Sequence, residues 1–336
     1  MRSLDIKNRL NDLSYADFDT NTRWPAILPE GFDPKAIMEL GKNPGLGLKS
    51  VHNKGITGKG VGIAIIDQTL LTEHFEYKDS LKSYEAINNK YDTAEMHGAA
   101  VASIAVGKTV GVVPEANLYY IALIPGEMKK DSFKYDFTWM DKAVDRVIEI
   151  NKTLPANEKI RVISISLGWS PGQTGYEEIN KAVERAKAEN IVVSCSLSET
   201  YGFKFDGLGR DVSSDPENKN SYLPGLWWAD QYYEGKRELG IDTLLVPMDS
   251  RTTASPTGAS DYAFYRSGGW SWAVPYIAGL YALACQVKPD INPETFWNNV
   301  LSTGDVVQIN HDGEPHSLGK IINPVKLFES CTNKII

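Results

Sequence analysis

The sequence predicts an α/β fold with a mainly parallel sheet and helices on both of its faces. Four short stretches are almost continuously apolar, which is typical of strands buried on both sides; they are Val61–Asp67, Asn117–Leu123, Val162–Leu167 and Ile191–Ser196. Amphipathic stretches with helical spacing separate the later ones, at 139–150 and 176–190. Strand and helix in alternation favour a parallel sheet, and such sheets bind ligands at the carboxyl ends of their strands.

The composition is that of a globular chain and argues against two classes of partner. Of 336 residues, 42% are hydrophobic and 23% are charged. The formal net charge of -8, without a dense cluster of lysine and arginine, argues against binding to nucleic acid. No apolar run approaches the length of about 18 residues that a membrane span requires. The charged first ten residues do not resemble a signal peptide, so we expect a cytoplasmic protein without a membrane partner.

The cysteines indicate packing rather than chemistry. There are three, Cys195, Cys285 and Cys331, an odd number without the spacing of metal ligands. We expect buried thiols in a reducing, intracellular compartment, and the histidines likewise provide no metal-ligand spacing. The sequence therefore assigns no metal site.

Three polar residues stand where a site is expected, and each also has a structural explanation. Asp67 closes an apolar strand, where a carboxylate can simply cap the following turn. His97 opens a run of small residues that suits a helix packed closely on a sheet. Ser271 lies in S-G-G-W-S-W-A-V-P-Y-I-A-G-L, where glycines precede a helix-like run, so it is either a helix N-cap or a nucleophile.

The sequence around each of these three residues resembles a motif of the subtilisin-like serine peptidases, and the three motifs occur in the same order. The strand I-A-I-I-D ending at Asp67 corresponds to their Asp motif. H-G-A-A-V-A-S from His97 corresponds to their His-Gly-Thr-His-Val-Ala-Gly. G-W-S-W-A-V-P-Y-I-A-G around Ser271 corresponds to their Gly-Thr-Ser-Met-Ala-x-Pro-x-Val-Ala-Gly. Shorter matches support them at 57–62, 110–118 and 165–168, and the resemblance extends over 55–284 with a weaker fit between 198 and 260.

The resemblance implies a subtilisin-like three-layer sandwich and a catalytic triad. A serine hydroxyl is a poor nucleophile near neutral pH, so an imidazole must accept its proton and later return it to the leaving amine. A carboxylate holds the tautomer of that imidazole and stabilises its charged form. These roles fall on Ser271, His97 and Asp67, and the position of Ser271 at a helix start directs backbone N–H groups at the developing oxyanion.

The sequence departs from the family pattern at three places. Gln68 and Thr69 follow the aspartate, where the family usually has Ser or Thr and then Gly. The family's oxyanion asparagine is missing, and Ser198 or Glu199 falls at its position, with the Ser198 hydroxyl as the candidate donor. Tryptophans replace the usual Thr and Met on either side of the serine, at 270 and 272, where they serve packing or narrow the cleft.

The resemblance also implies how a peptide would bind. Ser166, Leu167 and Gly168 correspond to the backbone edge that pairs with an extended peptide or protein substrate. The chemistry requires no cofactor. Calcium stabilises some family members as a structural ion, but the sequence does not locate a site for it.

We expect an N-terminal extension over 1–50 and a peptidase domain over 51–336, with an elaborated loop region around 199–260 that flanks the cleft. The Pro-rich stretch Asp17–Pro34 is either a restraint lying across or near the cleft or a strap that packs on the domain. Its brevity resembles the extensions of intracellular bacterial members. The sequence thus predicts an intracellular serine endopeptidase; the alternative is a catalytically weak or inactive pseudoprotease that binds a peptide or protein.

Overall fold

The computed structural model describes residues 4–90, 92–130, 132–196 and 202–332. A five-stranded sheet with every neighbouring pair parallel lies at its centre, in the order β3-β4-β2-β7-β8. Its strands are β2 (Gly62–Asp67), β3 (Leu81–Ile87), β4 (Asn117–Leu123), β7 (Ile160–Ile165) and β8 (Val192–Cys195). All four apolar stretches of the sequence are strands of this one sheet, which confirms the predicted α/β class.

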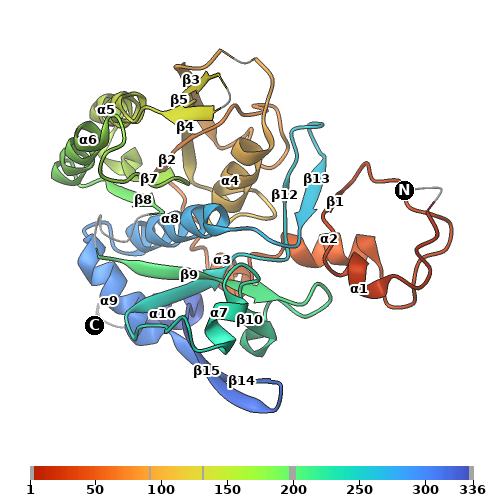
Figure 1. Ribbon diagram of the computed structural model, residues 1–336. Coiled ribbons are helices and arrows are strands. Elements are labelled where there is room, and N and C mark those ends of the chain that lie inside the picture. Colours follow the sequence, from red (N-terminus) through yellow and green to blue (C-terminus); the bar gives the residue numbers. More distant parts are fainter. Residues whose placement is uncertain (1–3, 91, 131, 197–201, 333–336) are drawn as a thin grey trace.

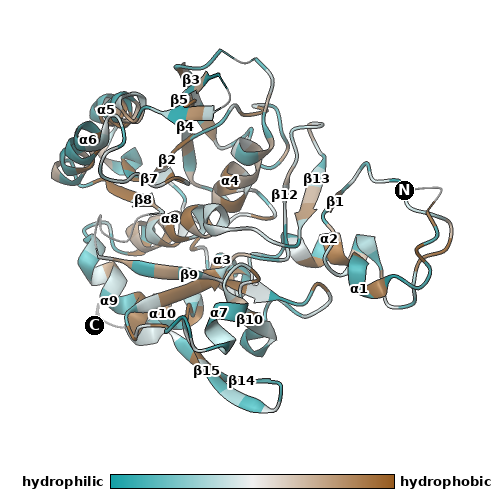
Figure 2. Cartoon of the chain, viewed as in Figure 1, coloured by the Kyte–Doolittle hydropathy of each residue, from teal (hydrophilic) through white to brown (hydrophobic). Residues whose placement is uncertain are grey.

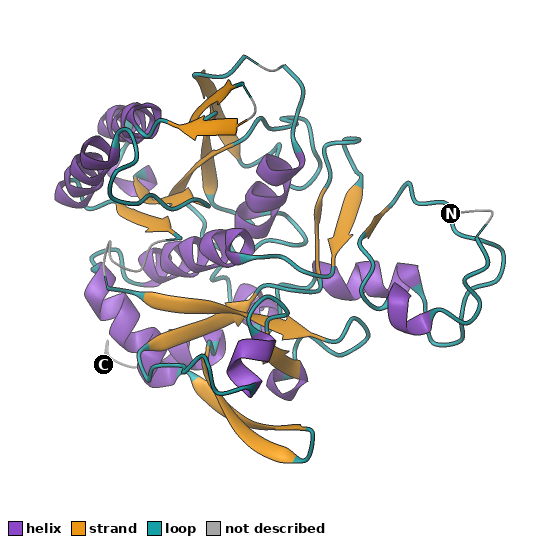
Figure 3. Ribbon diagram, in the orientation of Figure 1, coloured by secondary structure: helices purple, strands orange, loops and turns teal. Residues whose placement is uncertain are grey.

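Helices cover both faces of this sheet and complete three layers (Figures 1 and 3). Alternate residues of β2 point to opposite sides. Ile63 and Ile65 pack with α4 (Met96–Val106) and α8 (Trp270–Val287), whereas Ala64 and Ile66 pack with the other helix pair. That second pair is α5 (Thr138–Thr153) and α6 (Tyr176–Ala188). The arrangement is the subtilisin-like three-layer sandwich that the sequence predicts.

The two helix pairs differ in how much of their surface is buried. In α4, nine consecutive residues from Gly98 to Val106 are buried, and small side chains allow this close packing. In α8, Gly279 faces Val112 so closely that an added Cβ would lie 2.7 Å from it. The outer helices α5 and α6 bury one stripe only, and Figure 2 shows their hydrophilic outer surfaces in teal.

A second five-stranded sheet lies on the other side of α8, in the order β10-β9-β11-β15-β14. Its strands are β9 (Lys204–Arg210), β10 (Tyr222–Pro224), β11 (Thr243–Pro247), β14 (Asp305–His311) and β15 (Glu314–Ile321). Three of these five come from the region that we expected to be an elaborated loop, and β11 is buried along its whole length. This region is polar and rich in glycine, so its sequence does not indicate strands. The strands form because they pair with partners that are remote in sequence.

The N-terminal extension packs beside this core. Its elements are α1 (Leu10–Leu13), β1 (Phe18–Asp19) and α2 (Pro34–Lys42). Strand β1 pairs with β13 (Tyr262–Tyr265), which pairs in turn with β12 (Arg251–Ala254). The Phe18 ring lies 5.1 Å from that of Phe264 and also contacts Trp24 and Phe32. These contacts support the role of a packing strap.

The remaining α-helices and strands pack around these two sheets. They are α3 (Leu48–Asn53), α7 (Ala229–Tyr233), α9 (Pro293–Thr303), α10 (Pro324–Thr332) and the two-stranded sheet of β5 (Gly126–Lys129) and β6 (Ser132–Tyr135). Within the described ranges, no helix combines the length and apolarity needed to cross a membrane. Cys195 and Cys285 are buried as expected, while the side chain of Cys331 lies outside the described part.

Candidate active site

Asp67 ends β2, the central strand of the parallel sheet, and its side chain is only 6% exposed. Groups from other elements hold the turn that follows. The Tyr120 hydroxyl donates to the Gln68 carbonyl at 2.5 Å, and the Thr69 carbonyl accepts the Glu95 N–H at 3.0 Å. The Asp67 carboxylate also accepts the Gln68 N–H at 2.8 Å.

His97 lies in the first turn of α4 and faces this carboxylate. Its Nδ1 lies 2.6 Å from Oδ1 of Asp67. Burial lowers the pKa of His97, but the negative charge of Asp67, its hydrogen bond and the charge of Glu95 together raise it above its ordinary value. Nδ1 therefore carries the proton and donates to the aspartate, which leaves Nε2 as the free basic nitrogen when the ring is neutral.

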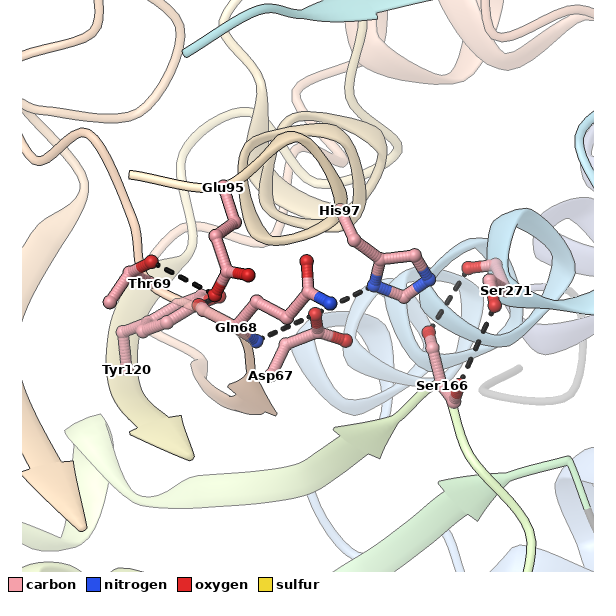
Figure 4. A network of polar contacts seen from close by, with 8 residues as sticks. All are labelled: Asp67, Gln68, Thr69, Glu95, His97, Tyr120, Ser166 and Ser271. Carbon is pink, nitrogen blue, oxygen red and sulfur yellow. Dashed lines mark hydrogen bonds and ion pairs between the residues drawn. The ribbon is translucent and has the colours of Figure 1, made fainter. Parts of the chain in front are cut away.

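Ser271 is the second residue of α8, and Figure 4 shows the His97 ring lying between Asp67 and Ser271. The N-cap of α8 is Gly269, with φ of 70°, so the interpretation of Ser271 as a helix cap is wrong. A left-handed backbone at this point favours glycine. Among the described residues, the Ser271 Oγ makes one long contact, 3.5 Å to the Ser166 carbonyl, so none of these residues holds the hydroxyl in a strong bond.

A proline and a serine together fix the backbone that carries Ser271. Pro275 lies inside α8, not in its first turn, and it has no N–H to donate to the carbonyl four residues earlier. That carbonyl belongs to Ser271. It accepts a hydrogen bond from the Ser166 hydroxyl instead, at 3.0 Å. The end of β7 is thereby joined directly to the turn that carries the serine (Figure 4).

Ser166 and Leu167 follow β7 and line the same cleft as Asp67, His97 and Ser271; Gly168 is next in the chain but does not line it. The cleft has a volume of about 1060 Å³. The Leu167 carbonyl already accepts the Ser196 N–H at 3.2 Å, which joins this edge to the end of β8. The two oxyanion candidates, Ser198 and Glu199, lie outside the described residues.

The two tryptophans that flank the serine point to different partners. Trp272 is 3% exposed, and its ring lies 5.7 Å from that of His97 in an edge-on arrangement. Trp270 instead donates its indole N–H to the buried carboxylate of Asp206 at 3.0 Å and contacts Trp227. Neither lines the cleft described above, so packing on both sides of the serine explains them better than substrate contact.

Some contributing residues carry little or no signal in the sequence. Asp249 is buried just after β11, where its carboxylate accepts the N–H groups of Gly268 and Leu226, both at 2.8 Å. Burial raises the pKa of Asp249 to about 6 despite these bonds. Glu95 raises the pKa of His97 and also joins α4 to the turn after β2. The only indication of Asp249 in the sequence is a carboxylate that follows a strand, and the sequence contains no indication of the role of Glu95.

The extension also approaches the turn before the serine. Asp17 accepts the Arg266 N–H at 2.7 Å, and the Arg266 side chain donates to the Ser14 carbonyl. The described lining of the cleft includes no residue of Asp17–Pro34. The hypothesis that this stretch restrains activity stays a prediction, and deletion of the residues before Gly45 tests it.

An α/β sandwich that brings a carboxylate, an imidazole and a serine hydroxyl together is the kind of scaffold that serine hydrolases use. The sequence pattern of the subtilase family (Peptidase S8) matches residues 58–246, more than half of the chain. The chain therefore belongs to the subtilase family of serine peptidases. The matched range contains Asp67, His97 and Ser166, and it ends before Ser271.

Individual relatives are distant. The chain is 24% identical to Subtilisin E of Bacillus subtilis (strain 168) over 288 residues, which cover 76% of this chain and 70% of that protein. It is 27% identical to the Major intracellular serine protease of the same strain over 246 residues, covering 68% of this chain and 70% of that protein.

Solved structures agree on the fold. The prenylagaramide maturation protease PagA superposes with a TM-score of 0.55 at 16% identity, covering 85% of this chain and 99% of that one. The PatG macrocyclase domain gives 0.53 at 13% identity, covering 85% and 95%.

Proposed function

We propose that this protein is a serine endopeptidase that hydrolyses peptide bonds through an acyl-enzyme on Ser271. The observation that carries the proposal is the 2.6 Å contact between Oδ1 of Asp67 and Nδ1 of His97. The imidazole ring of His97 lies between the Asp67 carboxylate and Ser271. Membership of a family of serine peptidases supports the same chemistry as this juxtaposition of three side chains.

In this mechanism the neutral His97 accepts the proton of Ser271 through Nε2 as the hydroxyl attacks the peptide carbonyl. Asp67 holds the Nδ1–H tautomer and stabilises the imidazolium. Its charge and hydrogen bond already raise the pKa of His97, which favours the same charged form. The imidazolium then protonates the leaving amine. Water hydrolyses the ester on Ser271 by the same steps in reverse.

The oxyanion needs donors, and one is available in the first turn of α8. The first amides of a helix have no helical acceptor and lie at the positive end of its dipole, which suits the Ser271 N–H for this role. We assign the second donor to Ser198. Ser166, Leu167 and Gly168 are assigned to the edge that pairs with the peptide backbone.

The substrate is a peptide or protein, and the three side chains carry out the reaction without a metal or cofactor. The free, buried Cys285 supports an intracellular setting. We assign the whole of 51–336 to one peptidase domain, because α8 contacts both sheets and its residues belong to a core shared with α4 and β11.

A fluorophosphonate probe tests the function directly, since it modifies only an activated serine. The wild-type protein should be labelled and should digest casein, whereas Ser271→Ala and His97→Ala proteins should do neither. Labelling that survives Ser271→Ala contradicts the assignment of the nucleophile. Absence of labelling in the wild-type protein, with or without its first 44 residues, favours the pseudoprotease that binds a peptide.

A further inference from the structure

The peptide unit that joins Trp270 to Ser271 carries the N–H that the mechanism above assigns to the oxyanion. It lies at the start of α8, where Gly269 is the N-cap and no side chain of the described residues caps the helix. Helix ends fray, because their first amides have no helical acceptor. The position of this peptide unit therefore depends on the contacts of its own side chains.

Trp270 is anchored by a hydrogen bond from its ring. The indole N–H donates to Oδ1 of Asp206 at 3.0 Å. Packing restrains this ring less than it restrains Trp272, which is 3% exposed, because Trp270 is only partly buried. Trp270 and Asp206 also border a cavity of about 240 Å³. A ring beside open space has room for other orientations, so the bond to Asp206 holds it in this one.

The acceptor of this bond is itself fixed. Asp206 is buried and lies on β9, which pairs with β10 on one side and with β11 on the other. Its carboxylate also accepts the Gly207 N–H at 3.1 Å and an N–H of the Arg237 guanidinium. A buried carboxylate needs such partners, and together they hold it in one orientation.

Arg237 extends the chain of contacts away from the nucleophile. Its guanidinium carbon lies 5.5 Å from the ring of Trp228, which is buried and donates its indole N–H to the Gly207 carbonyl at 2.7 Å. The Arg237 backbone N–H donates to the Gln231 carbonyl at 2.9 Å. Strand β9 lies alongside α8 (Figure 1). The segment between β10 and β11 is thereby connected through Asp206 to the residue that precedes the nucleophile.

We infer that Asp206 is a positioning residue for catalysis. By accepting the Trp270 indole N–H, it orients the peptide unit between Trp270 and Ser271, and with it the N–H that donates to the oxyanion. The inference rests on the proposed endopeptidase function. The described lining of the cleft does not include Asp206, so this residue acts through Trp270 and not by touching the substrate. Its contribution belongs to the transition state, where the oxyanion develops.

Trp270→Phe tests the inference, because it removes the indole N–H and keeps an aromatic ring. Initial rates with a short chromogenic peptide give kcat and KM separately, and thermal unfolding gives Tm. Complete loss of an oxyanion donor lowers kcat by about 10² to 10³, a figure measured in subtilisin, a member of this family. A donor that is present but less well oriented should cost less, so kcat should fall about tenfold while KM changes less than about twofold.

Trp227→Phe is the matched control. It makes the same chemical change in a neighbouring indole, which lies 5.9 Å from the Trp270 ring in an edge-on arrangement and belongs to a residue that is 59% exposed. Its kcat should stay at the wild-type value. An unchanged kcat in Trp270→Phe, or an equal decrease in both variants, overturns the inference. So does a change confined to KM, because the ring would then act on substrate binding.

A double-mutant cycle decides whether Asp206 and Trp270 act through one bond. Asp206→Ala removes the acceptor and should lower kcat about as much as Trp270→Phe. In the combined protein the second substitution should lower kcat by less than about twofold, because the bond is already absent. Losses that multiply show independent effects and overturn the inference. The same cycle in an Arg237→Ala background removes the unpaired guanidinium as a source of instability.

Labelling by the fluorophosphonate probe separates this inference from the proposed chemistry. A wild-type protein that is not labelled overturns the endopeptidase function, and the inference falls with it. A labelled wild-type protein whose Trp270→Phe variant keeps its kcat overturns the inference alone.

Discussion

The two ends of the cleft are built in different ways. At one end the Asp67 side chain is 6% exposed, and its neighbours are fixed by hydrogen bonds from β4, α4 and β7. At the other end Met128 of the β5–β6 hairpin is 65% exposed, and Tyr135 at the base of the hairpin stacks on buried Phe137. Proton transfer requires fixed geometry in a site with little water, whereas apolar recognition requires accessible surface.

This contrast explains why the effect of a substitution should depend on the end at which it lies. A change at the buried end removes a bond that has no alternative partner. A change on the exposed hairpin removes no such bond and should have a smaller effect. The four predictions below concern the buried end.

Removal of the nucleophile should have the largest effect. Ser271→Ala should lower kcat by about 10⁶, a figure taken from the same substitution in subtilisin, a member of this family. Measurement of casein digestion and of probe labelling checks it. Comparable activity in the variant would place the chemistry elsewhere.

Asp67→Asn should lower kcat by about 10⁴, the cost known for the equivalent change in a Ser-His-Asp protease. The carboxylate accepts hydrogen bonds at both oxygens, whereas the asparagine amide has one accepting oxygen and one donating nitrogen. The variant therefore no longer enforces the Nδ1–H tautomer of His97. Kinetics with a short chromogenic peptide measure the loss. A decrease of less than tenfold would show that the 2.6 Å contact does not support turnover.

The pH profile should follow His97. Its pKa is raised, so the ring becomes charged and inactive as a base when the pH falls through a value above 6.5. Below that value kcat/KM should decrease about tenfold per pH unit. Stability has the opposite sign: the stabilising contribution of the imidazolium is complete below 6.5 and is lost as the pH rises through the folded pKa. An acid limb centred below 6.5 would contradict the assignment.

Ser166→Ala should produce the smallest of these effects, about a tenfold decrease in kcat/KM. It leaves the Ser271 carbonyl without the donor that replaces the missing N–H of Pro275. Ser194→Ala is the matched control, because Ser194 donates to the α8 carbonyl of Val274 at 3.2 Å. Equal effects from the two substitutions would show that the link at Ser271 has no special role in positioning.

Much of the fold could be predicted because its signals are local. A strand such as β2 is apolar along its length, and α5 carries a stripe of apolar residues, so neighbours in the sequence suffice to identify them. Strand β9 was missed because its polar and glycine residues are stabilised by pairing with β11, more than thirty residues later. The same limit hid the carboxylate of Asp249, whose two donors come from separate loops.

The sequence by itself determined the α/β class and the family resemblance, and it predicted the candidate residues Asp67, His97 and Ser271, because motifs and periodicity are properties of short stretches. Only the tertiary structure decided how these residues are held. The Ser166 bond that replaces the N–H of Pro275 and the tyrosine that fixes the turn after Asp67 depend on residues that meet across elements. Such contacts arise when packing brings remote side chains together, and spacing along the chain does not encode them.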